Sequence, residues 1–207
     1  IKQRSNLDYS TPYSSFPFIT PSFEKAGIIP VKAEFHDRLF PYSELKGNAT
    51  EVEEEAALKG ITKIYIGAPQ NPIKLKIGDP IYIYRIDNST GQPTYRSAVT
   101  SFCTITNLTI IRSRFSSIVD KEKYLRLAGN KTVFTLQELK AIYEKPNLVM
   151  IEMVYNGFFG KGHNVIHRRL ADNGFFSCYP YEIEYSKEDF TNILRMGNVD
   201  VQNVIID

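Results

Sequence analysis

The sequence that decides the fold runs from Lys63 to Ser101 and reads KIYIGAPQNPIKLKIGDPIYIYRIDNSTGQPTYRSAVTS. It predicts three successive strands, at Ile64–Ile66, at Ile81–Arg85 after a Gly-Asp-Pro turn, and at Tyr95–Thr100 after a polar loop. The strands end in polar or basic residues, and no catalytic motif accompanies them. We therefore expect a small β-barrel that binds a ligand, rather than an enzyme.

Length and composition indicate a folded domain with a substantial core. The chain has 207 residues, of which 43% are hydrophobic, enough for one domain or for one domain plus an extension. Its 25 basic and 23 acidic residues give a net charge of +2, without the large basic excess typical of nucleic-acid-binding proteins. Any basic binding site must therefore be a local cluster. The 13 Tyr and 13 Phe residues favour a β-rich fold and suit surfaces on which bases stack.

The sequence also bears on location and redox state. No apolar run approaches the ~18 residues that cross a membrane, so we expect no membrane partner and a cytoplasmic location. Cys103 and Cys178 are expected to be buried, reduced thiols, with a disulfide left open. The chain begins at Ile1, which leaves open a processed start or a piece of a longer protein.

Residues 1–29 are expected to form an extended arm or linker, and residues 30–207 the barrel domain. Pro12, Pro17 and Pro21 punctuate this aromatic- and Ser-rich segment, and proline removes backbone donors from regular ladders. Its phenylalanines are too apolar for free solvent. We expect the arm to lie against a surface, either of this domain or of a neighbouring one.

Elsewhere, hydrophobic periodicity and capping residues predict short strands and helices that do not alternate regularly. Strands are expected at Ile29–Phe35, Cys103–Arg114, Lys131–Phe134, Leu148–Tyr155 and Tyr181–Tyr185, with a turn at His36–Pro41. Helices are expected at Glu51–Lys59, Asp120–Ala128, Thr135–Lys145, Asn164–Asn173 and Ser186–Met196. This order argues against a doubly wound parallel sheet. It predicts an α+β fold, a mixed and partly closed β-barrel with short helices inserted between strands.

Several short motifs resemble those of a known domain family. They are FHDRLFP at Phe35–Pro41, KIY at Lys63–Tyr65, GDPIYIYR at Gly78–Arg85, RSAVTS at Arg96–Ser101, KTVFTLQEL at Lys131–Leu139 and SKEDF at Ser186–Phe190. In this order and spacing they resemble the PUA-like barrel domain, kin to EVE and ASCH domains, found C-terminal to GNAT-type acetyltransferase domains in certain bacterial proteins. The resemblance covers about residues 30–197, and Cys103 and Tyr179–Glu182 depart from the family pattern.

The resemblance implies a PUA-like fold and a non-catalytic recognition module that binds RNA or a modified nucleobase. An alternative is an accessory domain that recognises a substrate or partner for an acetyltransferase-like protein. The acetyl-CoA loop itself is absent, because its nearest match, Arg126–Lys131, ends in lysine and closes a helix. A third possibility is a hydrolase or nuclease acting through His36 and Asp37. The expected partners are RNA or single-stranded DNA, an upstream acetyltransferase domain, or a separate protein.

The candidate ligand site lies at the strand ends of the 63–101 stretch. A base needs an aromatic face and hydrogen-bonding groups, and a phosphate needs a guanidinium or an ammonium. The residues that supply these groups are Lys63, Tyr65, Tyr84, Arg85, Arg96, Ser97, Thr100 and Ser101. Side-chain alternation places Tyr82 and Tyr84 on one strand face and Arg85 on the other. A solvated hairpin with core tyrosines is the competing interpretation.

No metal site and no cofactor are expected. His163 and His167 have the i, i+4 spacing of ligands on one helix face, but no Glu follows His163. Arg168 and Arg169 would also repel a cation.

Overall fold

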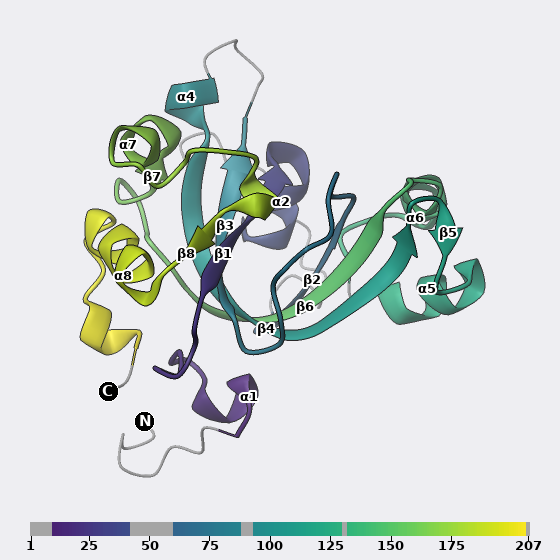
Figure 1. Ribbon diagram of the computed structural model, residues 1–207, viewed down its shortest axis with the longest axis horizontal. Helices are drawn as coiled ribbons and strands as arrows, with labels where there is room; N and C mark the ends of the chain where they lie inside the picture. Colours follow the sequence, from purple (N-terminus) through teal and green to yellow (C-terminus); the bar gives the residue numbers. More distant parts are fainter. Residues whose placement is uncertain (1–9, 42–59, 88–92, 130–131, 206–207) are drawn as a thin grey trace.

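The computed structural model describes residues 10–41, 60–87, 93–129 and 132–205. Its centre is a strongly curved mixed sheet with the strand order β2-β6-β4-β3-β1-β8, and short helices lie around it (Figure 1). β1 runs parallel to β3, and the other strand pairs are antiparallel. This half-barrel with inserted helices confirms the expected fold class.

The element bounds are as follows. The strands are β1 (Ala26–Lys32), β2 (Thr62–Gly67), β3 (Pro80–Ile86), β4 (Ala98–Ser113), β5 (Ser116–Ser117), β6 (Leu148–Phe158), β7 (Val165–Ile166) and β8 (Glu184–Tyr185). The α-helices are α1 (Pro12–Ser15), α2 (Ala33–Leu39), α4 (Pro93–Arg96), α5 (Lys121–Ala128), α6 (Leu136–Tyr143), α7 (His167–Asp172) and α8 (Lys187–Met196). Two 3-10 helices are η3 (Pro180–Glu182) and η4 (Val201–Asn203).

The longest strand, β4, curves the whole sheet. It spans 16 residues and pairs with β3 on one side and β6 on the other. Its register against β6 shifts between Phe102 and Cys103 and at two later points, and such bulges bend and twist a strand. The prediction of separate strands at 95–100 and 103–114 is therefore wrong. β4 begins at Ala98 and continues without a break, while Tyr95 and Arg96 belong to α4.

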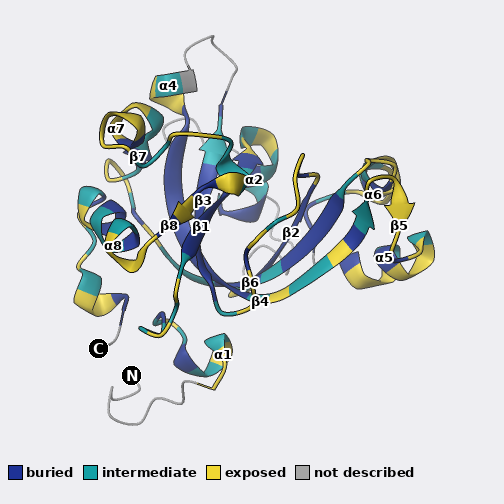
Figure 2. Cartoon of the chain, viewed as in Figure 1, coloured by how far each residue is buried: buried dark blue, intermediate teal, exposed yellow. Residues whose placement is uncertain are grey.

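Alternation along β3 divides the core between the two faces of the sheet. Tyr82 and Tyr84 belong to one buried cluster, which also contains much of α8, while Ile81 and Ile83 belong to another. Arg85 follows the parity of Ile81 and Ile83, as predicted. A third cluster lies beneath α5 and α6, so buried residues line both faces of the curved sheet (Figure 2).

Polar side chains cap the starts of three helices, α5, α6 and α8. Thr135 and Glu138 form a capping box at the start of α6, and Ser186 with Asp189 forms another at the start of α8. The Asp120 carboxylate accepts a hydrogen bond of 2.8 Å from the backbone N–H of Lys123 at the start of α5.

The segment expected as a strand end and turn at 33–41 is largely helical. α2 replaces it because the chain leaves β1 at Lys32 and packs its apolar side inward, with Leu39 and Phe40 buried. The Phe40 backbone N–H donates to the His36 carbonyl at 2.7 Å and closes the last turn. β1 itself begins at Ala26, inside the range expected for the arm.

Three other expected elements are shorter than predicted or absent. Thr132–Phe134 forms bends and no strand, because the Thr132 hydroxyl accepts the Phe134 backbone N–H at 3.2 Å. α7 begins only at His167, since Val165 and the residue after it pair with β4 as β7. The region expected as strand 181–185 begins with η3, which Pro180 opens, and only its last two residues form β8. The predicted helix 51–59 and the loop 88–91 lie outside the described residues.

The N-terminal segment lies against this domain from residue 10 onward. Ile19 is buried, and its backbone N–H donates to the Val204 carbonyl at 2.8 Å. The Phe23 ring meets the Phe190 ring edge-on at 5.6 Å. The arm was expected to lie against this domain or against a neighbouring one, and its described part lies against this domain.

Two further expectations from the sequence concern the burial of the cysteines and the presence of a membrane-spanning helix. Cys103 is buried, but Cys178 is exposed, which corrects the expectation of two buried thiols, and both are free. Among the described residues, no helix has the length and apolar character needed to cross a membrane.

Candidate functional site

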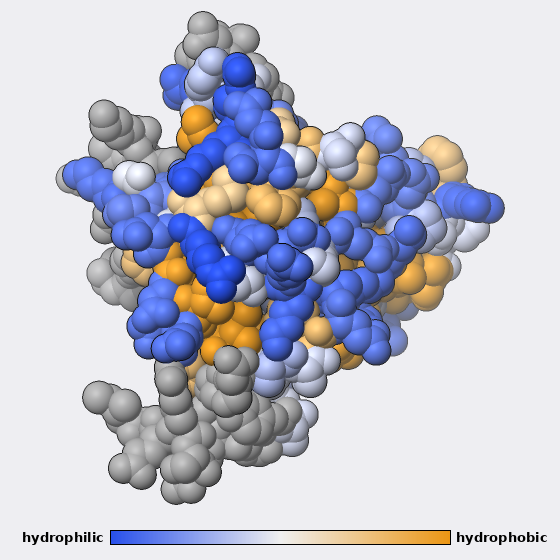
Figure 3. Space-filling model, turned by 60° about the vertical axis from the view of Figure 1, so that its left-hand side comes forward, coloured by the Kyte–Doolittle hydropathy of each residue, from blue (hydrophilic) through white to orange (hydrophobic). Residues whose placement is uncertain are grey.

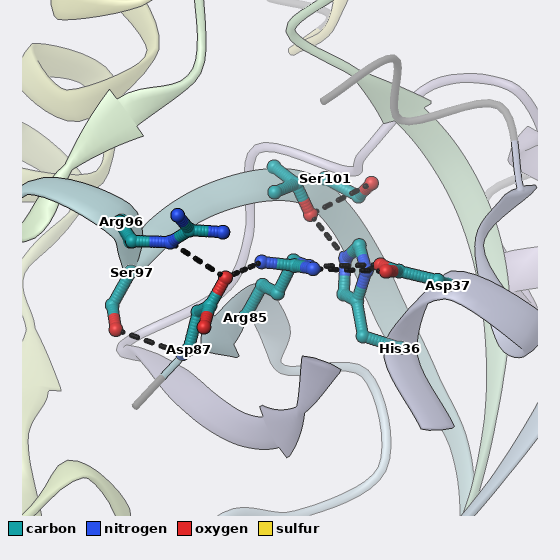
Figure 4. A network of polar contacts seen from close by, with 8 residues as sticks. His36, Asp37, Arg85, Asp87, Arg96, Ser97 and Ser101 are labelled. Carbon is teal, nitrogen blue, oxygen red and sulfur yellow. Dashed lines mark hydrogen bonds and ion pairs between the residues drawn. The ribbon is translucent and has the colours of Figure 1, made fainter. Parts of the chain in front are cut away.

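An ion-pair network joins α2 to β3 and contains one of the predicted basic residues. Arg85 donates from Nε and from one terminal nitrogen to the two carboxylate oxygens of Asp37, at 2.8 and 2.9 Å (Figure 4). Its other terminal nitrogen donates to Asp87 at 3.0 Å. The Arg85 side chain is only 12% exposed. Its guanidinium is therefore committed to two carboxylates, and the pKa of Arg85 is raised by its hydrogen bonds to them.

Asp87 links this network to the start of β4. It accepts a second hydrogen bond from Arg96 Nε at 3.1 Å, and its backbone N–H donates to the Ser97 hydroxyl at 3.0 Å. Ser97 is buried, whereas the Arg96 side chain is 47% exposed. Of the predicted residues in this network, Arg96 alone presents a large part of its side chain to solvent.

His36 extends the network into the barrel interior. Its Nδ1 lies 2.8 Å from Asp37 and its Nε2 lies 2.7 Å from the Thr100 hydroxyl. These partners assign the neutral Nδ1–H tautomer, which donates to Asp37 and accepts from Thr100. Burial lowers the pKa of His36, against the opposing effect of Asp37. The His36 side chain is fully buried, so it does not face a surface where a substrate could bind.

A chain of polar side chains continues from Thr100 across the interior. The Ser101 hydroxyl lies 3.4 Å from that of Thr100 and 3.3 Å from that of Tyr155. Lys63 Nζ lies 5.9 Å from the centre of the Tyr155 ring, a cation–π arrangement. Burial lowers the pKa of Lys63, whose side chain is almost fully buried. Thr100, Ser101 and Lys63 are thus interior residues.

Tyr84 lies on the opposite face of the sheet from Arg85. Its hydroxyl lies 2.8 Å from His167 Nδ1, and its ring packs at 4.9 Å from Phe176. His167 starts α7, while His163 lies in the preceding turn, so the two imidazoles do not share a helix face. The described part of the chain contains no group of three or more His, Cys, Asp or Glu that could hold a metal ion.

One cavity, lined in part by Tyr65, lies between the end of β1 and β2, and we call it the β1–β2 cleft. Its volume is about 480 Å³, within the range of small-molecule sites. α2 forms one wall, and α6 and η3 form the others. Its lining is mainly apolar and aromatic, with two ammonium groups: Pro30, Val31, Lys32, Phe35, Leu39, Ile64, Tyr65, Ile66, Gly67, Ala68, Ile86, Val133, Phe134, Ile142, Lys145, Tyr179, Pro180 and Tyr181.

Tyr65 connects the two sides of the β1–β2 cleft. Its hydroxyl donates to the Pro30 carbonyl at 3.0 Å and also contacts the Tyr181 hydroxyl. Burial raises the pKa of both tyrosines, so both hydroxyls keep their protons at neutral pH. Close to these hydroxyls, β2 ends at Gly67, where a Cβ would collide with both tyrosine side chains. A larger residue at this position would therefore force the two tyrosine side chains to shift.

Around Arg96, α4 and α7 present a small basic and aromatic surface. Tyr95 is 57% exposed, and its hydroxyl lies 3.5 Å from a guanidinium nitrogen of Arg168. Arg168 is paired with Asp172 at 2.8 Å, which offsets part of the positive charge. The face seen in Figure 3 is mainly hydrophilic, with apolar side chains visible between the polar ones.

The structure thus separates the predicted site residues. Tyr65 lines the β1–β2 cleft, Arg96 lies on the surface, and Tyr84 packs on the far face of the sheet. The buried polar network contains Arg85, Ser97, Thr100 and Ser101, and Lys63 is buried beside the Tyr155 ring. Sequence reasoning missed most of the cleft lining, including Phe35, Phe134 and Lys145. The motifs FHDRLFP and KTVFTLQEL marked two of these segments, but nothing local indicated that they meet.

Comparison with known proteins supports the fold. No family model and no curated protein matches the chain. The crystal structure of the ZmASCH S128A mutant protein from Zymomonas mobilis is similar with a TM-score of 0.51 at 12% identity, covering 84% of this chain and 96% of that chain. ASCH from Zymomonas mobilis gives a TM-score of 0.50 at 11% identity, covering 81% and 92%. The chain therefore has the fold of ASCH proteins, a PUA-like barrel.

Proposed function

We propose that this chain is a non-catalytic recognition module that binds single-stranded RNA, with one base, plain or modified, entering the β1–β2 cleft. The observation that carries the proposal is the pairing of aromatic rings with ammonium groups in one cavity. Phe35, Phe134 and Tyr179 offer faces or edges to a base, while Lys32 and Lys145 offer charges to its phosphates. Among sites for small ligands, this combination suits a nucleotide.

The exposure of these residues is consistent with a ligand. Lys32 and Lys145 are exposed, whereas Phe35, Phe134 and Tyr179 are partly buried. A base that enters the cleft would cover ring surface that water now contacts, while the lysines stay at the mouth. The local placement of positive charge also fits a chain whose net charge is only +2.

The predicted residues have different roles under this proposal. Tyr65 shapes the floor of the cleft, and Arg96 adds a positive charge at a second surface. Arg85, Ser97 and Thr100 hold α2 and β4 in place through the buried network, since their polar groups already have protein partners. The choice of RNA follows from the likeness to nucleic-acid-binding barrels, and because a fold does not fix a function, the test includes DNA.

The other two functions considered from the sequence lack such support. Acid–base catalysis by His36 and Asp37 needs a histidine that can reach a substrate, and His36 is fully buried. A role beside an acetyltransferase domain stays a prediction from the resemblance, since no contact or cavity of the described residues favours it.

The test is the binding of labelled single-stranded RNA, followed by fluorescence anisotropy at several salt concentrations. We expect salt-sensitive binding that Phe134→Ala weakens by about tenfold, as for loss of one base–aromatic stack. Lys145→Ala should weaken binding and reduce the slope of log affinity against log salt by about 0.7, the loss of one phosphate contact. Lys140→Ala is the matched control. Lys140 is exposed on α6, the helix that ends just before Lys145, and it does not line the cleft.

Single-stranded DNA and double-stranded RNA of the same sequence complete the experiment. Wild-type protein that binds no single-stranded RNA even at low salt would contradict the proposal. So would cleft variants that bind as tightly as the Lys140→Ala control.

A further inference from the structure

The tip of the β4–β5 hairpin is a strained two-residue turn. Ser113 pairs with Ser116, so Arg114 and Phe115 alone make the connection. Both have positive φ, 48° for Arg114 and 69° for Phe115. This is the backbone of a type I′ turn, which strongly favours Gly, because it has no Cβ, and Asn, whose short polar side chain tolerates positive φ better than other side chains do. An arginine followed by a phenylalanine is therefore an unfavourable choice for folding alone.

Backbone hydrogen bonds hold this turn in place. The Arg114 N–H donates to the Asn147 side-chain oxygen at 2.9 Å, and the Phe115 N–H donates to the Pro146 carbonyl at 2.8 Å. The Phe115 carbonyl in turn accepts from Arg112 at 2.7 Å. The Phe115 side chain nevertheless is 70% exposed. The fold thus fixes the backbone of this residue while leaving its ring in solvent.

The segment that holds the turn also borders the β1–β2 cleft. Lys145 lines the cleft, and the next two residues, Pro146 and Asn147, accept the turn's N–H groups. The Asn147 side chain also donates to the carbonyls of Pro69 and Gln70, just beyond β2, at 3.0 Å each. Lys145 and Asn147 are two residues apart, so their Cα atoms lie within about 7 Å of each other. The turn and the mouth of the cleft are therefore neighbours.

Charges around the turn favour an anionic ligand. The Glu144 carboxylate is paired with Lys121 at 2.7 Å and lies 3.6 Å from Arg112. Arg114 and Lys145 make no ion pair with any residue in the described ranges. An exposed ring with two such cations on neighbouring segments matches a nucleic acid, in which bases and phosphates alternate.

We propose that Phe115 is a second stacking platform for RNA. With one base in the β1–β2 cleft, the base of a nearby nucleotide stacks on the Phe115 ring, and the phosphates between them face Lys145 and Arg114. This inference rests on the proposed function and extends it from a single base to a short stretch of single-stranded RNA.

The test compares ligands with and without a flanking base. The ligands are a mononucleotide, a short oligonucleotide, and the same oligonucleotide with one flanking position abasic. Phe115→Ala and Phe115→Leu should each weaken oligonucleotide binding by about tenfold and leave mononucleotide binding unchanged. Phe115→Tyr should keep wild-type affinity. Ile118→Ala is the control, since Ile118 is 58% exposed near the same turn but offers no ring.

The outcomes separate the two proposals. Absence of any RNA binding by the wild-type protein would overturn the proposed function. Wild-type binding of the oligonucleotide that Phe115→Ala does not weaken would overturn the role of Phe115 alone. Wild-type affinity for the oligonucleotide in Phe115→Leu would also overturn the role of Phe115. Leucine has no ring on which a base can stack, but it keeps an apolar side chain of the kind that contacts a protein partner.

Discussion

Arg85 and Asp37 form a bidentate ion pair between β3 and α2, with both hydrogen bonds shorter than 3.0 Å. Asp37 is acidic enough to stay charged there. Burial raises its pKa, but hydrogen bonds from Arg85 and His36 more than offset this and lower it overall. This pair fixes the helix that forms a wall of the β1–β2 cleft, so its first consequence is for stability.

Arg85→Ala should destabilise the protein by about 3 kcal/mol, because it removes the buried guanidinium that pairs with both Asp37 and Asp87. Arg96→Ala should lose less than about 1 kcal/mol, since the Arg96 side chain is 47% exposed and its ion pair is screened by water. Urea denaturation of the two variants measures the difference. Equal losses would mean that the network does not support the fold as described.

The stability of the protein should fall as the pH drops below about 6.5, the pKa of an unfolded histidine. The pKa of His36 is lower in the folded state because burial disfavours its charged form, so the unfolded state takes up protons first. The contribution of His36 to the free energy of unfolding is complete above about pH 6.5 and is lost as the pH falls toward the pKa of His36 in the folded state. Urea midpoints measured between pH 7.5 and 5.5, in roughly half-unit steps, follow this loss.

His36→Asn is the comparison for this pH series. Asparagine can still donate to Asp37 but does not titrate, so the slope should decrease. It should not vanish, because burial also lowers the pKa of His167. An unchanged slope would assign the pH dependence to other groups.

Phe115→Gly should raise stability by about 0.5–1 kcal/mol. Glycine removes the strain of a positive φ, about 1–2 kcal/mol, while the greater freedom of the unfolded chain takes back part of that gain. Thermal or urea unfolding measures the change, and RNA binding measured in parallel should weaken. A variant that is less stable than wild type would show that the ring contributes packing to the fold.

Gly67→Ala should distort the β1–β2 cleft without changing any charge. Its Cβ would collide with the side chains of Tyr65 and Tyr181, whose hydroxyls meet beside this glycine. We expect weaker RNA binding and a stability loss of about 1–3 kcal/mol, typical of overpacking. Gly60→Ala is the control, because its Cβ would meet only backbone atoms at 3.7 Å or more. Unchanged RNA affinity in Gly67→Ala would argue against the cleft as the binding site.

Local rules recovered much of the fold. Period-two alternation correctly assigned Tyr82 and Tyr84 to one face, and the capping-box pattern at Thr135 and the capping serine Ser186 marked two helix starts. The errors arose where tertiary contacts decide. α2 was missed because its few residues gain stability from packing under the sheet, and β7 was missed because only its pairing with β4 makes it a strand.

The candidate site was less predictable for the same reason. Arg85 and Thr100 are residue types that often bind ligands. Their side chains instead hydrogen-bond to Asp37 and His36, which lie on α2, far away in the sequence. No sequence pattern indicates such pairing. The lining of the β1–β2 cleft likewise comes from separate segments that only the curvature of the sheet brings together.

The uninterrupted run of β4 ties the whole domain together energetically. Val99 packs in the first buried cluster, Ile105 in the second, and Ile111 in the third. Because one strand belongs to every core, no core can melt while another keeps its part of β4 in place. The domain should therefore lose all of its structure in a single cooperative transition.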